Sequence, residues 1–246
     1  PPGVINLVTG DGTAVSNVAL HHPDLAGIHF TGSTGTFQHL WRTVGENIAA
    51  YKGYPRIVGE TGGKDFVVAH PSADIGVLKT ALVRGAFEYQ GQKCSAASRA
   101  YIPRSIWNRM RDDFCDEAKA LPMGNVAEDL SLFMGAVIDD RAFAKHKAAL
   151  ERARGIDTMK VLTGGTLDDS EGWFVQPTVL ESADPDDEIF VKEYFGPIVG
   201  VHVYDDGDYD TMLDQMESVA QYALTGAIVA QDRAAIVDAT ERLRFA

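Results

Sequence analysis

The chain has 246 residues, of which 45% are apolar and 23% charged, and its formal net charge at pH 7 is −13. This balance is typical of a globular protein, with enough chain for one large domain or two smaller ones. The acidic excess argues against nucleic acid as a partner, because such a surface needs clustered Lys and Arg. No apolar run approaches the length of a membrane span, so we expect no membrane insertion.

The predicted elements alternate between strands and helices, which is the pattern of an open α/β sheet with crossover helices. Apolar residues recur at helical spacing between positions 37 and 48 and indicate an amphipathic helix. In chain order we expect strands at 4–8, 27–31, 56–58 and 66–69, with a helix over about 34–51 before the third of them. The second half is expected to form helices at 73–89, 105–120, 140–154, 208–219 and 233–246, and strands at 99–102, 160–162, 174–180, 197–204 and 226–230. Ser105 is the expected N-cap of the helix that follows it.

A glycine pair at Gly62 and Gly63 is the expected domain boundary, because a hinge is tolerated there. It divides the chain into residues 1–62 and residues 63–246. Both ends of the sequence look cut, since Pro1 is not an initiator Met and the last helix has no cap. We therefore expect the chain to be part of a longer polypeptide.

Cys94 is the first candidate catalytic residue. It lies in a glycine-led polar stretch, 91–99 (GQKCSAASR), where Lys93 and backbone N–H groups could lower the pKa of the thiol. The alternative is a buried structural thiol, which is what most free cysteines are. Cys115, the other cysteine, lies within a predicted helix and is expected to serve packing. Two cysteines form no disulfide framework, and no spaced Cys or His pattern predicts a metal.

Glu60 is the second candidate, because hydrolysis of a thioester needs a base that can activate water. It stands in a glycine-rich stretch, 59–64 (GETGGK). Taken alone it could equally be a solvated carboxylate in a turn.

Two further stretches could bind a cofactor. Residues 30–35 (FTGSTG) follow a strand and open a helix, and a helix N-terminus can hold a diphosphate. Residues 193–197 (EYFGP) precede a strand, where Glu193 could bond a ribose hydroxyl and Phe195 could bound a flat ring. Read separately, each could be an ordinary turn.

In their order, these stretches resemble the aldehyde dehydrogenase superfamily over essentially the whole chain. The matching residues are 30–33 (FTGS), 60–64 (ETGGK), 91–94 (GQKC) and 193–197 (EYFGP). Three more stretches resemble the branch that oxidises L-glutamate 5-semialdehyde, formed from 1-pyrroline-5-carboxylate, to L-glutamate in proline degradation. They are residues 36–41 (TFQHLW), 72–74 (SAD) and 87–96 (FEYQGQKCSA).

The resemblance implies a fold and a mechanism. The fold would be part of a Rossmann-type nucleotide domain followed by a catalytic α/β domain. Cys94 would attack the aldehyde carbon, hydride would pass to NAD, and Glu60 would activate the water that releases the acid. Ser95 would receive the substrate carboxylate. The residues implied in cofactor binding are Gly32, Ser33, Thr34, Gly35, Thr36, Glu193 and Phe195.

The resemblance also implies what lies outside the chain and where the protein works. An oxyanion-stabilising Asn before residue 1 and a substrate loop after residue 246 are expected, so we expect this piece alone to be inactive. The whole protein is expected to form a homo-oligomer, in the cytoplasm of a bacterium or the mitochondrial matrix of a eukaryote. The alternatives are a dehydrogenase for another small aldehyde or one that passes the acyl group to coenzyme A, a non-catalytic protein of the same fold, and a cofactor-free acyl hydrolase.

Overall fold

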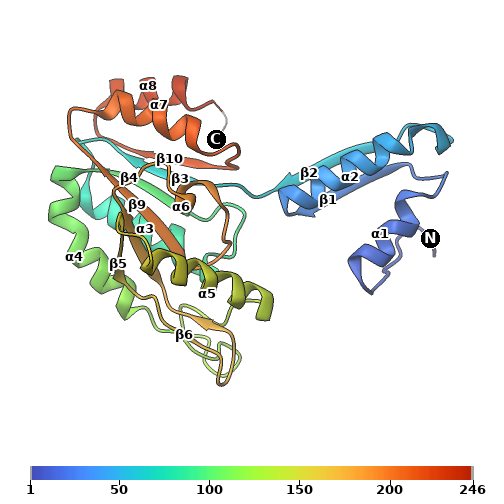
Figure 1. Ribbon diagram of the computed structural model, residues 1–246, viewed down its shortest axis with the longest axis horizontal. Coiled ribbons are helices and arrows are strands. Elements are labelled where there is room, and N and C mark those ends of the chain that lie inside the picture. The colour runs from blue at the N-terminus through green and yellow to red at the C-terminus, as the bar shows by residue number, and fades with distance from the viewer. Residues whose placement is uncertain (1, 245–246) are drawn as a thin grey trace. The chain divides into compact units, whose positions relative to one another are not determined.

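The structure, a computed structural model, describes residues 2–244, which form two compact units divided between Thr61 and Gly62 (Figure 1). The first unit contains a pair of parallel strands, and Leu20, Leu40 and Val44 form the centre of its small core. Its elements are α1 (Gly12–Leu20), β1 (Gly27–Gly32), α2 (Thr34–Glu46), η1 (Ile48–Ala50) and β2 (Arg56–Thr61).

The second unit is built on a six-stranded sheet whose strand order is β10-β3-β4-β9-β8-β5. All neighbouring strands are parallel except β5 and β8, which are antiparallel. The strands of the unit are β3 (Phe66–Ala69), β4 (Arg99–Pro103), β5 (Met159–Thr163), β6 (Leu167–Asp168), β7 (Phe174–Val175), β8 (Thr178–Ser182), β9 (Ile198–Tyr204) and β10 (Gly226–Val229). Its helices are α3 (Ile75–Phe87), η2 (Glu88–Gly91), α4 (Arg104–Ala120), α5 (Asp140–Arg154), α6 (Glu188–Val191), α7 (Tyr209–Val219) and α8 (Arg233–Arg242).

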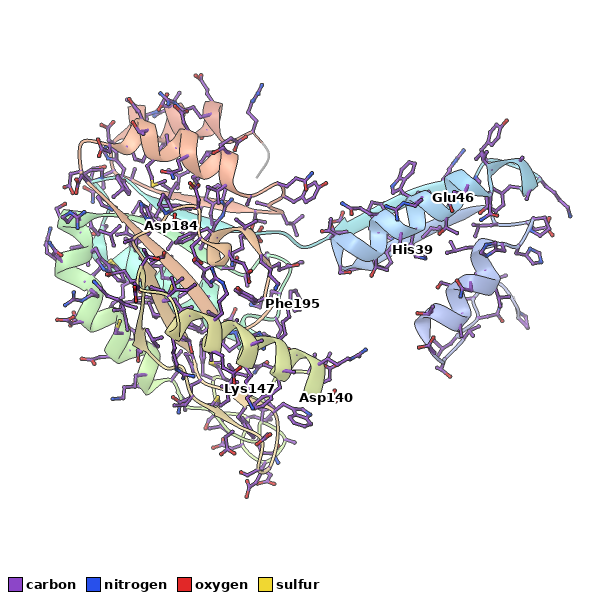
Figure 2. All side chains as sticks on the ribbon, viewed as in Figure 1. His39, Glu46, Asp140, Lys147, Asp184 and Phe195 are labelled. Carbon is purple, nitrogen blue, oxygen red and sulfur yellow. The ribbon has the colours of Figure 1, made fainter. Side chains whose placement is uncertain are left out.

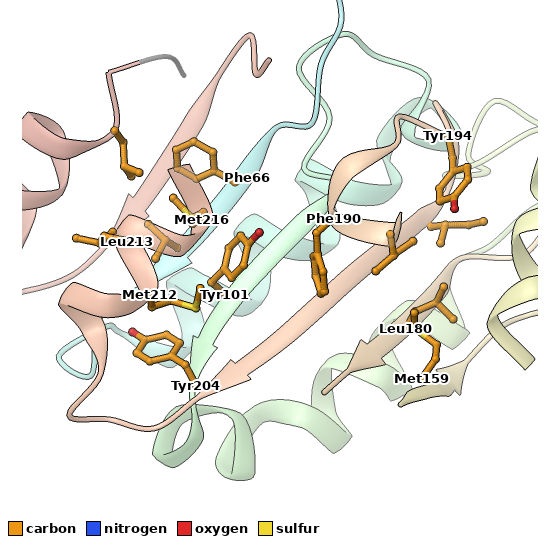
Figure 3. Close-up of a cluster of buried hydrophobic side chains, with 14 of the residues drawn as sticks. Phe66, Tyr101, Met159, Leu180, Phe190, Tyr194, Tyr204, Met212, Leu213 and Met216 are labelled. Carbon is orange, nitrogen blue, oxygen red and sulfur yellow. The ribbon is translucent and has the colours of Figure 1, made fainter. Parts of the chain in front are cut away.

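Both faces of this sheet are buried under helices. Successive residues of a strand point to opposite sides, so one strand contributes to the core on each face. In β3, Phe66 and Val68 join the core beneath α5, α7 and α8, which Figure 3 shows in part. Val67 and Ala69 face the other core, which packs against α3 and α4. The result is a three-layer α/β arrangement, which confirms the predicted fold class.

Three predicted elements are wrong. Residues 4–8 form no strand, because this exposed run has no pairing partner among the described residues. The predicted strand 174–180 is two strands, β7 and β8, because Pro177 offers no N–H to a ladder. Ser105 does not cap α4, which already begins at Arg104; Asp206 instead accepts a hydrogen bond from the Ser105 N–H at 3.0 Å.

The other differences are smaller. The structure adds the helix α1, which was not predicted. Asp11 is its N-cap and accepts a hydrogen bond from the Ala14 N–H at 2.8 Å. The helix predicted over 34–51 ends at Glu46 and is followed by η1. Of the helix predicted over 233–246, α8 ends at Arg242, and residues 245–246 lie outside the described part of the chain.

Candidate active site

The turn after β1 leads directly into α2. It places the backbone N–H groups of the first turn of α2 at one edge of the two-stranded sheet. Ser33 is the N-cap of α2, where its Oγ accepts from the Thr36 N–H at 3.2 Å and lies 2.8 Å from the Thr36 hydroxyl. Within residues 2–244, the N–H groups of Thr34 and Gly35 have no hydrogen-bond partner. A helix start with free N–H groups and the positive end of the helix dipole suits a phosphate group.

Glu60 lies in the strand β2, although the sequence suggested a turn there. In the parallel register Glu60 stands opposite Thr31, and Thr61 stands opposite Gly32. The Glu60 side chain is exposed. The first unit therefore brings Glu60 and the 32–36 turn to the same edge, at the carboxyl ends of the strands, where open parallel sheets bind ligands.

Cys94 lies on the loop that joins η2 to β4 in the second unit, and it is exposed together with Ser95. Cys115 is half-buried on α4, and its burial raises the pKa of the thiol to about 11. Because the thiolate is the reactive form, Cys115 is a poor nucleophile at neutral pH. The accessible thiol of the described residues is thus Cys94.

Lys93, the charged residue next to Cys94, is paired with an acidic side chain. Lys93 Nζ donates to Glu88 Oε2 at 2.5 Å and lies 5.3 Å from the centre of the Tyr89 ring. Arg84 also donates to Glu88. The hydrogen bond from Lys93 lowers the pKa of the Glu88 carboxyl. The Lys93 ammonium is therefore paired with Glu88.

Glu193 and Phe195 lie on the loop between α6 and β9, where Figure 2 labels Phe195. Glu193 Oε1 accepts from the Gly63 N–H at 3.2 Å, while burial raises the pKa of its carboxyl. Phe195 has a φ of 57° and is 40% exposed. A non-glycine residue in this region is strained, and such strain gathers at functional loops.

The Cys94 loop and the Glu193 loop are in direct contact. A Cβ placed on Gly91, whose φ is +63°, would lie 2.6 Å from the carbonyl oxygen of Gly196. Both loops line a cavity of about 10 Å³ that also contacts Lys64. This volume holds about one water molecule. The second unit thus gathers the Cys94 loop, Glu193 and Phe195.

Two buried side chains near these loops were not recognised from the sequence. Lys64 is 1% exposed, and burial, followed by the charge of Arg99, lowers the pKa of its ammonium to about 7. His146 is fully buried against Gly196, where a Cβ would lie 1.7 Å from His146 Nε2, and burial lowers the His146 pKa to about 4. The available signal for Lys64 was its place at the end of the 60–64 stretch, two residues before the buried strand β3; His146 has none.

Residues 2–244 contain neither a metal site nor a membrane-spanning helix. They hold no group of three or more His, Cys, Asp and Glu side chains suited to a metal ion. In the same part of the chain, no helix combines the length and apolar character needed to cross a bilayer.

Open, mainly parallel α/β sheets are an architecture on which many nucleotide-binding enzymes are built. The sequence profile of the aldehyde dehydrogenase family matches residues 1–246, so the chain belongs to the aldehyde dehydrogenase family. This confirms the predicted membership.

Within this family, the chain is similar to several delta-1-pyrroline-5-carboxylate dehydrogenases. The chain is 48% identical to a probable delta-1-pyrroline-5-carboxylate dehydrogenase of Schizosaccharomyces pombe and 44% identical to a mitochondrial one of Danio rerio. Its sequence is 60% identical to that of the Mycobacterium tuberculosis Delta-pyrroline-5-carboxylate dehydrogenase. Compared with the crystal structure of that protein bound with NAD, the chain has a TM-score of 0.93. Each match covers 100% of this chain, but only 45%, 44% and 44% of the respective relative.

Proposed function

We propose that the whole protein carrying this chain oxidises L-glutamate 5-semialdehyde to L-glutamate with NAD, as a step of proline degradation. The observation that carries the proposal is the exposed Cys94 on a glycine loop in contact with the Glu193 loop. The substrate is supported by three relatives, which are delta-1-pyrroline-5-carboxylate dehydrogenases, and the cofactor by the Mycobacterium tuberculosis relative, whose crystal structure contains NAD.

The reaction divides into two steps, each assigned to one side chain. The Cys94 thiolate adds to the aldehyde carbon and gives a thiohemiacetal. Loss of hydride from that carbon leaves a thioester on Cys94. Glu60 then takes a proton from water, which attacks the thioester carbon, and the Cys94 thiolate leaves as glutamate is released. Bound NAD supplies the chemistry of accepting the hydride.

The cofactor residues are proposed on features of each unit. In the first unit, Gly32, Ser33, Thr34, Gly35 and Thr36 would hold the diphosphate, which the partner-free N–H groups at the start of α2 fit. In the second unit, Glu193 would accept a hydrogen bond from the nicotinamide ribose, and Phe195 would bound the ring. Ser95, exposed beside Cys94, would contact the substrate carboxylate.

The remaining parts of the proposal concern the whole protein. We assign the first unit to a nucleotide-binding domain and the second to the catalytic domain. Assembly into a homo-oligomer is proposed from the resemblance alone. The compartment would be the cytoplasm in a bacterium or the mitochondrial matrix in a eukaryote, in line with the mitochondrial name of the Danio rerio relative.

The test is steady-state kinetics of the whole protein with NAD. We expect kcat/KM for glutamate semialdehyde to exceed that for simple aliphatic aldehydes, and Cys94→Ala to abolish NADH formation. Cys115→Ala is the matched control and should retain activity. Equal preference for aliphatic aldehydes would contradict the substrate, and turnover by Cys94→Ala would contradict the mechanism.

A further inference from the structure

The backbone that leads into Cys94 is strained. Tyr89 and Gln90 have φ values of 55° and 58°, and Gly91 follows at 63°. Three successive left-handed residues include two that carry a Cβ, and such a backbone persists only where its surroundings hold it. Some nearby contact must therefore fix this segment.

Two glutamine side chains make that contact. Gln92 Oε1 accepts from the Ile138 N–H at 2.9 Å, across 46 positions of sequence. With its amide oriented to satisfy both ends, Gln90 accepts from the Gly135 N–H and donates to the Tyr89 carbonyl at 3.0 Å. Gln90 and Gln92 flank Gly91, and Gln92 lies two residues before Cys94.

The segment that receives these bonds, residues 133–138, is itself fixed. Met134 is fully buried in the core beneath α3 and α4. Val137 is 3% exposed in a second cluster, and its N–H donates to the Trp173 carbonyl at 2.8 Å. The Gly135 N–H lies between these two buried residues, and the Ile138 N–H follows Val137, although the Ile138 side chain is 81% exposed.

We propose that Gln92, assisted by Gln90, is a positioning residue that holds the Cys94 loop on the 133–138 segment and thereby sets the place of the thiol. The inference rests on the proposed function, because it takes Cys94 as the nucleophile. Gln92 acts through the backbone of the loop and contacts no reacting atom. A small displacement of a nucleophile can cost a large factor in rate, since attack needs a narrow range of distance and direction.

The experiment compares Gln92→Met, which keeps the length but loses the acceptor, with Gln92→Glu, which keeps an acceptor oxygen. In the whole protein, at the pH optimum of each variant, we expect Gln92→Met to lower kcat by roughly tenfold to a hundredfold. The KM for NAD should stay within about twofold, because the 32–36 turn is untouched. Gln92→Glu should recover most of the kcat. Gln231→Met is the matched control, because Gln231 is exposed and only its backbone N–H makes a hydrogen bond within residues 2–244.

Hydrogen exchange at the Ile138 amide supplies the second readout and should become faster in Gln92→Met. An unchanged kcat in Gln92→Met overturns the inference, whether or not exchange at Ile138 accelerates. Equal losses in the Met and Glu variants overturn it as well, because the acceptor would then not matter. If Gln92→Met does not fold, Gln92→Asn replaces it, since its shorter side chain cannot reach Ile138. Full turnover by Cys94→Ala would instead refute the proposed function.

Discussion

Lys64 is a buried ammonium beside the candidate site. Its Nζ has no hydrogen-bond partner among the described residues and lies 5.6 Å from the centre of the Tyr194 ring. Burial is the main cause of its lowered pKa, the charges of Arg99 and Lys145 add to it, and Glu193 and Asp65 oppose it. A buried charge without a partner destabilises the folded state.

This burial predicts a pH-dependent effect of Lys64→Met. The folded-state pKa of about 7 lies below the ordinary value of 10.5, so between these values the unfolded chain binds a proton that the folded chain does not. The buried Lys64 therefore lowers the free energy of unfolding by its full amount below about pH 7. This loss of stability disappears as the pH rises toward 10.5. We expect the free energy of unfolding of Lys64→Met to exceed that of the wild type by on the order of a few kcal/mol at pH 6, and by distinctly less at pH 9.

Thermal unfolding of the whole protein at both pH values measures this difference. Lys160→Met is the control, because the Lys160 side chain is 71% exposed and pairs only with Glu181. A gain in Tm for Lys64→Met that is the same at pH 6 and pH 9 would show that Lys64 is not neutralised on folding.

At the scale of elements, the short helix α6 anchors the loop that carries Glu193. Asp187 caps α6 by accepting from the Ile189 N–H at 2.8 Å, and it receives two hydrogen bonds from Arg152 of α5, at 3.0 and 2.7 Å. The Tyr194 hydroxyl donates to Glu188 Oε1 at 2.8 Å. The Glu193 loop is thus held to α6, and α6 to α5.

Replacing Asp187 by Ala should therefore affect both stability and cofactor binding. Loss of the cap and of a largely buried ion pair is expected to cost about 2–4 kcal/mol. Because the loop loses its anchor, the KM for NAD should rise several-fold. Asp210→Ala is the control, since the Asp210 side chain is 75% exposed and should cost about 0.5 kcal/mol or less. Equal stability losses in the two variants, measured by chemical denaturation, would contradict this role.

The elements show what local pattern can and cannot predict. Residues 66–69 and 198–204 were recognisable because a strand buried on both faces is a nearly continuous apolar run, which only His202 interrupts here. Helix α5 was recognisable because Asp139 caps it and Gly155 follows its end. The run at 4–8 has the same apolar character as a strand, but a strand also requires a pairing partner, which no local pattern reveals.

At the scale of the whole molecule, the site was predictable where glycine loops follow strands and helices. The glycine pattern predicted a loop after a helix for Cys94 and a turn between a strand and a helix for residues 32–36, and the structure has both. The bond from Ile138 to Gln92 was not predictable, because a backbone N–H leaves no mark in the sequence. The ion pair between Lys93 and Glu88 likewise depends on how the chain folds back over five residues.

In the proposed reaction, Cys94 carries the thioester and Glu60 activates the water that hydrolyses it. Rapid mixing of Glu60→Gln with NAD and glutamate semialdehyde tests these two roles most directly, with mass spectrometry of the quenched protein. We expect a burst of about one NADH per site, slow turnover afterwards, and an acyl group on the peptide that contains Cys94. Turnover at the wild-type rate without a burst, or an acyl group on any other residue, would contradict these roles.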